Sequence, residues 1–198
     1  MRRVCLLLVA LVWAISVSAQ SSAREWIEGL NYTLDDRYAL YMKVTAYGEQ
    51  MNGYFMVEKD SYYIQLGAME VYSDGKLRYE VNNTRKEVTE DRVNLDSRDL
   101  LTNPTRAFAF VESEFTASIS EKIHNGVILK LVPKQSADIT AVYVSVVWRD
   151  NRIVPMAIKY DYDGQEVMIA LVMADVNSAV MPRWNKSAYK SYDIVSFL

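Results

Sequence analysis

The stretch from Tyr38 to Val93 constrains the fold most, because apolar and polar residues alternate through several short segments of it. Side chains at every second position of a β-strand point to the same face of a sheet. The alternation therefore predicts consecutive strands with one apolar and one polar face. The predicted polar face carries Lys43, Thr45, Glu58, Gln65, Glu70, Arg78 and Glu80. The predicted apolar face carries Tyr38, Leu40, Met42, Val44, Phe55, Val57, Tyr62, Ile64, Leu66, Met69, Val71, Leu77, Tyr79, Val81 and Val88.

The N-terminus has the pattern of a secretory signal peptide. Arg2 and Arg3 precede an apolar run over residues 5–17, and the run ends in small residues up to Ala19. The run is shorter than the ~20 residues that a membrane-spanning helix needs. We expect residues 1–19 to be a cleavable signal peptide and residues 20–198 to be a single exported, soluble domain. Cleavage would remove Cys5, the only cysteine, so we expect no disulfide in the mature chain.

Composition limits the class of protein. A chain of 198 residues with 51% hydrophobic content can bury a substantial core. Its formal net charge of −3 argues against nucleic-acid binding, which usually requires a concentrated basic surface.

Other periodicities indicate what flanks and covers the strands. Helical spacing of Trp26, Ile27, Leu30 and Leu34 predicts a helix over residues 21–34. Asn103-Pro104 is a typical helix start, and a short apolar stripe follows it at Ala107, Phe108 and Val111. We expect this second helical segment to cover the apolar face. Further strands are predicted over residues 115–121, 127–132, 140–148, 153–160, 167–173 and 189–198, with a hairpin turn at His124-Asn125-Gly126. The chain should thus form about ten antiparallel strands joined by short turns.

Motifs for catalysis are scarce. His124 is the only histidine and falls in a turn, which suits neither a Ser-His-Asp site nor a metal site. We therefore expect no enzyme activity, no metal site and no cofactor. A hydrolase that uses paired carboxylates stays open as an alternative, with candidates at Asp35, Asp36, Glu87, Glu90, Asp91, Asp161 and Asp163.

Several segments, in order and spacing, resemble the outer-membrane lipoprotein carriers of LolA type. These carriers have a Gly-led strand, a second strand, a turn of the form "sDGk" and an "E/Q-V-t" strand. The corresponding segments here are Gly53-Tyr54-Phe55-Met56-Val57-Glu58-Lys59, Tyr63-Ile64-Gln65-Leu66, Ser73-Asp74-Gly75-Lys76 and Lys86-Glu87-Val88-Thr89. Leu131-Val132-Pro133-Lys134 is similar to the family's "L-x-P-k" hairpin, and Tyr189-Lys190-Ser191-Tyr192-Asp193-Ile194-Val195 resembles the closing strand of a divergent branch.

The resemblance implies an α+β fold: a strongly curved, unclosed antiparallel β-barrel with an N-terminal helix and short lid helices on its concave face. It also implies a monomeric periplasmic carrier for the acyl chains of lipoproteins. An inner-membrane ABC-type release complex would load it, and an outer-membrane acceptor would unload it. Family members latch the lid with an arginine followed by proline, where this chain has Lys59-Asp60. Lys59 is therefore the candidate for the latch.

On this hypothesis the curved sheet lines a hydrophobic cavity, and Ala107, Phe108 and Val111 act from the lid. A lipid- or partner-sensing regulatory domain on the same fold, without transport, is the alternative. The candidate lining residues are Leu40, Met42, Phe55, Val57, Tyr62, Ile64, Leu77, Tyr79, Leu129, Val144, Val146, Ile158 and Ile169.

Overall fold

A computed structural model describes residues 23–94, 104–106, 108, 111–135, 139–162, 165–176 and 179–198. The predicted signal peptide over residues 1–19 and the lid candidate Ala107 lie outside the described residues. The described strands all belong to one sheet. They are β1 (Arg37–Ala46), β2 (Glu49–Glu58), β3 (Ser61–Leu66), β4 (Met69–Ser73), β5 (Leu77–Asn82), β6 (Glu87–Arg92), β7 (Phe115–Ile123), β8 (Gly126–Pro133), β9 (Ala141–Arg149), β10 (Arg152–Tyr162), β11 (Gln165–Met173) and β12 (Asp193–Ser196).

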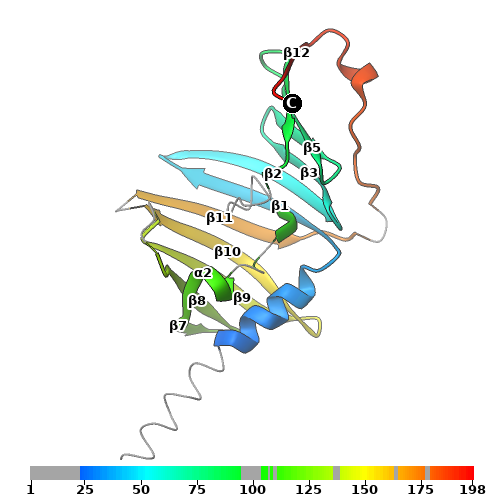
Figure 1. Ribbon diagram of the computed structural model, residues 1–198. Helices are drawn as coiled ribbons and strands as arrows, with labels where there is room; N and C mark the ends of the chain where they lie inside the picture. Colours follow the sequence, from blue (N-terminus) through cyan, green and yellow to red (C-terminus); the bar gives the residue numbers. More distant parts are fainter. Residues whose placement is uncertain are drawn as a thin grey trace, which may run out of the picture.

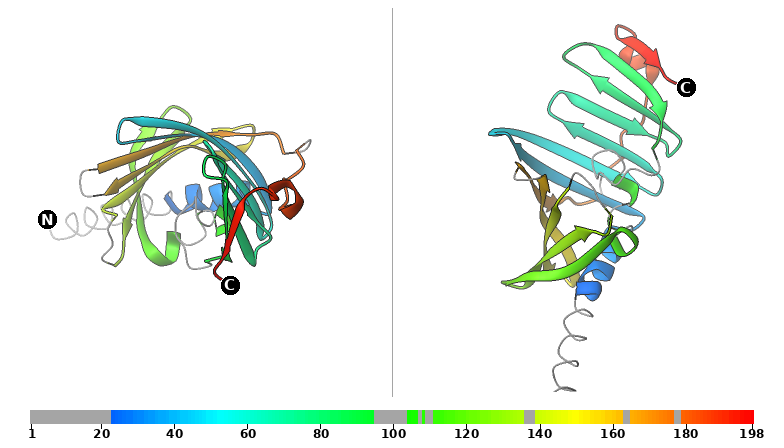
Figure 2. Two further views of the ribbon diagram at one scale, coloured as in Figure 1. Left: turned by 90° about the horizontal axis from the view of Figure 1, so that it is seen from above. Right: turned by 60° about the vertical axis from the view of Figure 1, so that its left-hand side comes forward.

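The sheet consists of two antiparallel meanders that meet at its centre. The strand order is β12-β6-β5-β4-β3-β2-β1-β11-β10-β9-β8-β7, so β1 pairs with β11 and joins the meanders. The sheet curls without closing, and the N-terminal helix lies on its concave side (Figures 1 and 2). This confirms the predicted fold class, with twelve strands in the described residues instead of about ten. The strand predicted over 189–198 is shorter: β12 follows the 3₁₀ turn η2 (Lys186–Tyr189) and pairs in parallel with β6.

The N-terminal helix spans residues 23–33 and lies against the concave face. Its side chains Ala23, Ile27 and Leu30 are buried in the same cluster as the concave side chains of the sheet. At Gly29 a Cβ atom would clash with Cδ1 of Ile153 on β10. The absence of a side chain at Gly29 therefore lets the helix approach the sheet closely.

The predicted tight turns are present. In the β4–β5 turn, the Asp74 carboxylate accepts hydrogen bonds from the amides of Lys76 and Leu77, and Gly75 has a φ of 90°. These hydrogen bonds lower the pKa of Asp74, the bond from the Leu77 amide contributing most. Asn125 takes the positive φ required by the β7–β8 hairpin turn.

The face assignment of β5 and β6 was wrong. Arg78 is aligned with Ser73 and Tyr62, so it shares their concave face. Tyr79 packs instead with the convex cluster, and the alternation of the strand places Leu77 on that face as well. Val81 and Val88 are also buried in the convex cluster and not on the concave face.

The convex side of β1–β6 is covered by a C-terminal segment whose packing there was not predicted from the sequence. We call residues 179–192 the C-terminal strap; it runs along the outer side of the sheet (Figures 1 and 2). Trp184 stacks between Tyr79 of β5 and Tyr189 of the strap, with ring centroids 4.4 and 5.0 Å away. The strap explains why the apolar side chains of β5 point to the convex face, because it gives Tyr79 and Val81 an apolar environment there.

Candidate functional site

The concave face of the sheet is a continuous apolar surface. Eleven of the thirteen predicted lining residues lie in one buried cluster on it, and none of the eleven is more than 4% exposed. The remaining two, Leu77 and Tyr79, lie on the convex side as described above. The eleven come from strands of both meanders: Leu40, Met42, Phe55, Val57, Tyr62, Ile64, Leu129, Val144, Val146, Ile158 and Ile169.

A short lid covers part of this surface. We define the lid as η1 (Pro104–Arg106), Phe108 and α2 (Val111–Glu114). Phe108 and Val111 are buried in the concave cluster. The turn η1 contacts β2 and β3, the strands that carry Phe55 and Ile64.

One buried side chain ties the lid to the sheet. The hydroxyl of Tyr38 on β1 donates a hydrogen bond to the carbonyl oxygen of Pro104, at 2.5 Å. The ring of Tyr38 packs edge-on against Phe55, with centroids 5.9 Å apart. Burial raises the pKa of Tyr38 above the usual range of a tyrosine, so the hydroxyl remains a donor. Alternation predicted Tyr38 on the apolar face and assigned it no role. A tyrosine that begins an otherwise aliphatic alternation was the available signal, because buried hydroxyls usually have a partner.

The outer surface of the lid is linked to its neighbours by charged side chains. Arg24 of the N-terminal helix forms ion pairs with Glu28, at 2.7 Å, and with Glu112 of α2, at 3.2 Å. Lys134, just after β8, donates to the carbonyl oxygen of Glu112 at 2.6 Å. Exposed ion pairs of this kind contribute about 0–1 kcal/mol each. The ion pair from Arg24 and the hydrogen bond from Lys134 therefore position α2 without holding the lid firmly against the sheet.

Lys59, the latch candidate, lies in the turn between β2 and β3 with a φ of 54°. Its side chain is exposed, and its amide donates to the carbonyl oxygen of Asp36 at 2.6 Å. Within the described part of the chain, the Lys59 ammonium forms no hydrogen bond or ion pair. A side-chain hydrogen bond from the sheet to the lid comes instead from Tyr38.

The apolar surface ends in a polar group at β5. Arg78 pairs with Glu80 on the same strand, with 2.7 Å between Nη2 and Oε2. The neighbouring hydroxyl of Tyr62 is buried, and burial raises its pKa. The positive charge of Arg78, together with side-chain hydrogen bonds to Ser73 and Arg78, opposes that shift. Alternation predicted Arg78 and Glu80 on the other face, so this polar group was not predicted from the sequence.

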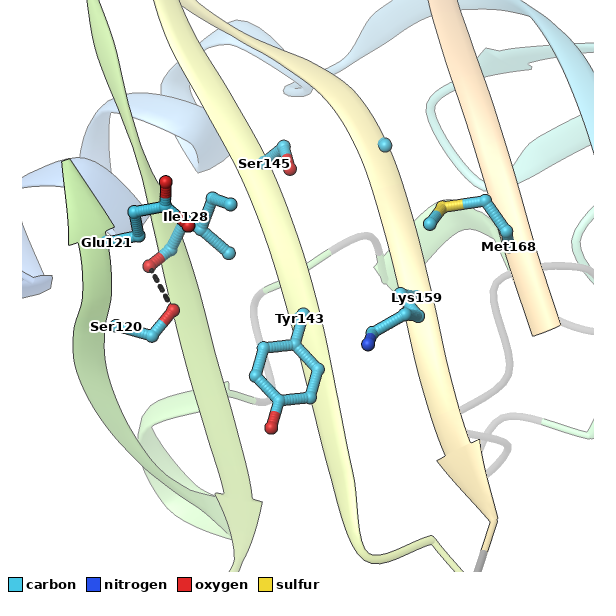
Figure 3. A pocket seen from close by; sticks show the side chains of 8 residues that line it. Ser120, Glu121, Ile128, Tyr143, Ser145, Lys159 and Met168 are labelled. Carbon is cyan, nitrogen blue, oxygen red and sulfur yellow. Dashed lines mark hydrogen bonds between the residues drawn. The ribbon is translucent and has the colours of Figure 1, made fainter. Parts of the chain in front are cut away.

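A pocket of about 450 Å³ lies on the opposite, convex face, over β7–β11 (Figure 3). Its lining includes Tyr143, Ser145 and Met168, which Figure 3 labels, and Ala157. The Lys159 ammonium lies 4.7 Å from the centre of the Tyr143 ring and 2.7 Å from a carboxylate oxygen of Glu166. The pocket is open to solvent and separated from the concave cluster by the thickness of the sheet.

The carboxylates considered for hydrolysis do not form a buried pair in the part of the chain described. Asp35, Asp36, Glu87 and Asp91 are exposed, Glu90 and Asp161 are half-buried, and Asp163 lies outside the described residues. Among the described residues, no three His, Cys, Asp or Glu side chains are arranged to hold a metal ion. The helices within these ranges are also too short or too polar to cross a membrane.

No protein-family model and no curated protein matches the chain. Among solved structures, it is similar to an uncharacterized conserved protein from Thermus thermophilus, with a TM-score of 0.56 and 10% identity over 88% of this chain and 99% of that one. A putative outer membrane lipoprotein-sorting protein domain from Vibrio parahaemolyticus aligns with a TM-score of 0.44 and 10% identity, over 86% of this chain and 99% of that one. A LolA superfamily protein from Nitrosomonas europaea aligns with a TM-score of 0.38 and 9% identity, over 84% and 96%. The Thermus protein shares the fold.

Proposed function

We propose that this chain is a periplasmic carrier that holds the acyl chains of lipoproteins against the concave face of its sheet. The observation that carries the proposal is a buried apolar surface, built from both meanders, beneath a short lid that Tyr38 ties to the sheet. A carrier needs such a surface to replace water around hydrocarbon. It also needs a cover that can be displaced when the cargo enters and leaves.

The energies of binding and of lid opening are compatible. Each buried methylene contributes about 0.8 kcal/mol, so a 16-carbon chain left in water costs on the order of 10 kcal/mol. Exposing Phe108 and Val111 would cost about 3 to 6 kcal/mol. Breaking the hydrogen bond from Tyr38 would add about 1 kcal/mol. An acyl chain that takes the place of the lid side chains therefore has enough free energy to open the lid.

The proposal includes the partners and location that the family resemblance implies. The carrier would act as a monomer between an inner-membrane ABC-type release complex and an outer-membrane acceptor. The lid is central to this cycle because it would exchange between covering the sheet and exposing it.

The distribution of tryptophans allows a direct test of binding and of its location. Trp26 packs against the concave cluster, whereas Trp184 lies in the strap on the convex side. We would prepare delipidated mature protein in two single-tryptophan forms, with the other tryptophans replaced by phenylalanine. A 16-carbon acyl ester with bromine atoms in its chain, which quench nearby indole fluorescence, would then be titrated into each.

Saturable quenching of Trp26 with little quenching of Trp184 is the expected result. An Ala157→Leu variant, which fills the convex pocket, should behave like the parent protein. Loss of binding in that variant would place the lipid on the convex face and contradict the proposal. Absence of any acyl binding would favour the regulatory alternative, in which the fold recognises a partner protein.

A further inference from the structure

The concave face changes from apolar to polar between β4 and β5. Tyr62, Ser73 and Arg78 are aligned across β3, β4 and β5, and aligned side chains in a sheet lie on one face. Val71 is aligned in the same way with Glu80. The backbone of β5 lies about two strand spacings (~10 Å) from β3. The guanidinium of Arg78 reaches the hydroxyl of Tyr62 and therefore lies at the margin of the surface formed by Tyr62, Ile64 and Val71.

Arg78 has an unused donor in this position. One terminal nitrogen pairs with Glu80, but the Nε atom is buried and has no hydrogen-bond partner among the described residues. Buried polar atoms in folded proteins nearly always have a partner, and leaving a donor unsatisfied costs about 1–3 kcal/mol. A buried N–H at the edge of a ligand-binding surface thus points to an acceptor supplied by the ligand.

The surrounding charges indicate what kind of acceptor fits. Glu80 is next to Arg78 on its own strand, and Asp91 is aligned with Arg78 on β6. An anionic ligand would meet two carboxylates and one guanidinium that is already paired with Glu80. A neutral carbonyl oxygen would accept a hydrogen bond from the Nε–H of Arg78 without adding charge.

We infer that Arg78 Nε binds the ester or amide carbonyl at the head of an acylated ligand, with the hydrocarbon lying on the apolar side of Tyr62 and Ile64. In an acyl lipid this carbonyl is the first polar group after the chain, which matches the order of apolar and polar side chains across β3–β5. The inference rests on the proposed function and narrows it to ligands that carry a carbonyl at this position.

The test compares two brominated lipids of equal chain length, one ester-linked and one ether-linked. Both contain the hydrocarbon, but only the ester has the carbonyl. A hydrogen bond from a charged donor contributes enough for about a tenfold difference in affinity. We expect the parent protein to bind the ester about tenfold more tightly than the ether.

The variant Arg78→Met should bind both lipids with equal, ether-like affinity. Arg92→Met is the matched control, because Arg92 is exposed and is aligned with Leu77 on the convex side. It should keep the preference for the ester. If Arg78→Met unfolds, Arg78→Lys retains a positive charge without the Nε donor and should lose the preference as well.

Equal binding of ester and ether by the parent protein would overturn the assignment of Arg78 while leaving acyl binding intact. Tighter binding of a free fatty-acid carboxylate than of the ester would also overturn it, because the site would then be an anion site. Failure of both lipids to bind would instead contradict the proposed function itself.

Discussion

The hydroxyl of Tyr38 on β1 and the carbonyl oxygen of Pro104 in the lid are joined by a hydrogen bond of 2.5 Å in the buried interior. Tyr38 thereby connects the central strand of the sheet to a segment that begins 66 residues later. This bond is buried, whereas the ion pair between Arg24 and Glu112 of α2 is exposed to solvent.

Replacing Tyr38 by phenylalanine should loosen the lid. The ring still packs against Phe55, but the carbonyl oxygen of Pro104 loses its donor, at a cost of about 1 kcal/mol. We expect several-fold faster uptake of an acyl probe and faster cleavage of the lid by proteases. An uptake rate equal to that of the parent protein would exclude Tyr38 from control of the lid.

Lys59 provides the contrasting case. Its side chain is exposed in the β2–β3 turn, where φ is 54°. Asparagine tolerates this conformation better than most residues and lacks the ammonium, so Lys59→Asn is a clean substitution. We expect acyl uptake and release to be unchanged in stopped-flow measurements. Release that differs several-fold from the parent's would restore Lys59 as the latch that the family resemblance implied.

Glu70 should make attachment of the strap dependent on pH. Its carboxylate accepts hydrogen bonds from Tyr63, Tyr72, Tyr189 and Asn83, over 2.8 to 3.2 Å. Burial tends to raise the pKa of Glu70, but the hydrogen bonds from Asn83 and the tyrosines together lower it. A lowered pKa means that the contribution of Glu70 is complete above its unfolded value of about 4.5 and is lost as pH falls through the folded value.

Acid titration followed by Trp184 fluorescence can measure this effect. The strap of the parent protein should loosen below about pH 4.5, and Glu70→Gln should remove that step while lowering stability at neutral pH by about 1 to 2 kcal/mol. Glu58→Gln is a useful control, since Glu58 forms a more exposed ion pair with Arg183. An acid transition of equal size in the Glu70 variant would show that another group is responsible.

Trp184 should anchor the strap through its two stacked neighbours. Truncation to alanine removes contacts with Tyr79 and Tyr189 and should lower the free energy of unfolding by about 2 kcal/mol. The strap should also become the first site of proteolysis. Trp184→Phe keeps most of the stacking and should lose less than half as much stability in denaturant titrations. Equal losses for both variants would argue against stacking as the source of the effect.

Much of the sheet follows from simple alternation, and the exceptions have a common cause. In β1–β3, Leu40, Phe55 and Ile64 were assigned to the correct face, although their neighbours Ala39, Met56 and Tyr63 are buried on the other side, in the convex cluster. In β5, Tyr79 and Val81 also alternate with charged residues, yet their apolar side faces the strap. A shift of one residue exchanges the faces of a strand, and alternation alone cannot say which face has the apolar cover.

Residues 179–188 of the strap were not predicted because they have neither helical nor strand periodicity, and residues 189–192 were predicted as part of a strand. The contacts of the strap depend on Met181, Trp184 and Tyr189, which are irregularly spaced. The polar margin at Arg78 was not predicted because alternation assigned Arg78 to the convex face instead of the concave face. The role of Tyr38 required knowledge of where Pro104 lies, and this contact spans 66 positions of the chain.

The pairing of β1 with β11 affects the order in which the protein folds. Leu40 is aligned with Met173, so the middle of the sheet brings together segments more than a hundred positions apart. Such distant pairing is slow to form, because a large loop must close before any contact compensates for the lost entropy. The two meanders can each assemble locally, but they unite only after almost the whole polypeptide is present. A chain shortened before Gln165 would retain both groups of hairpins and still lack the seam that bends them around a common interior.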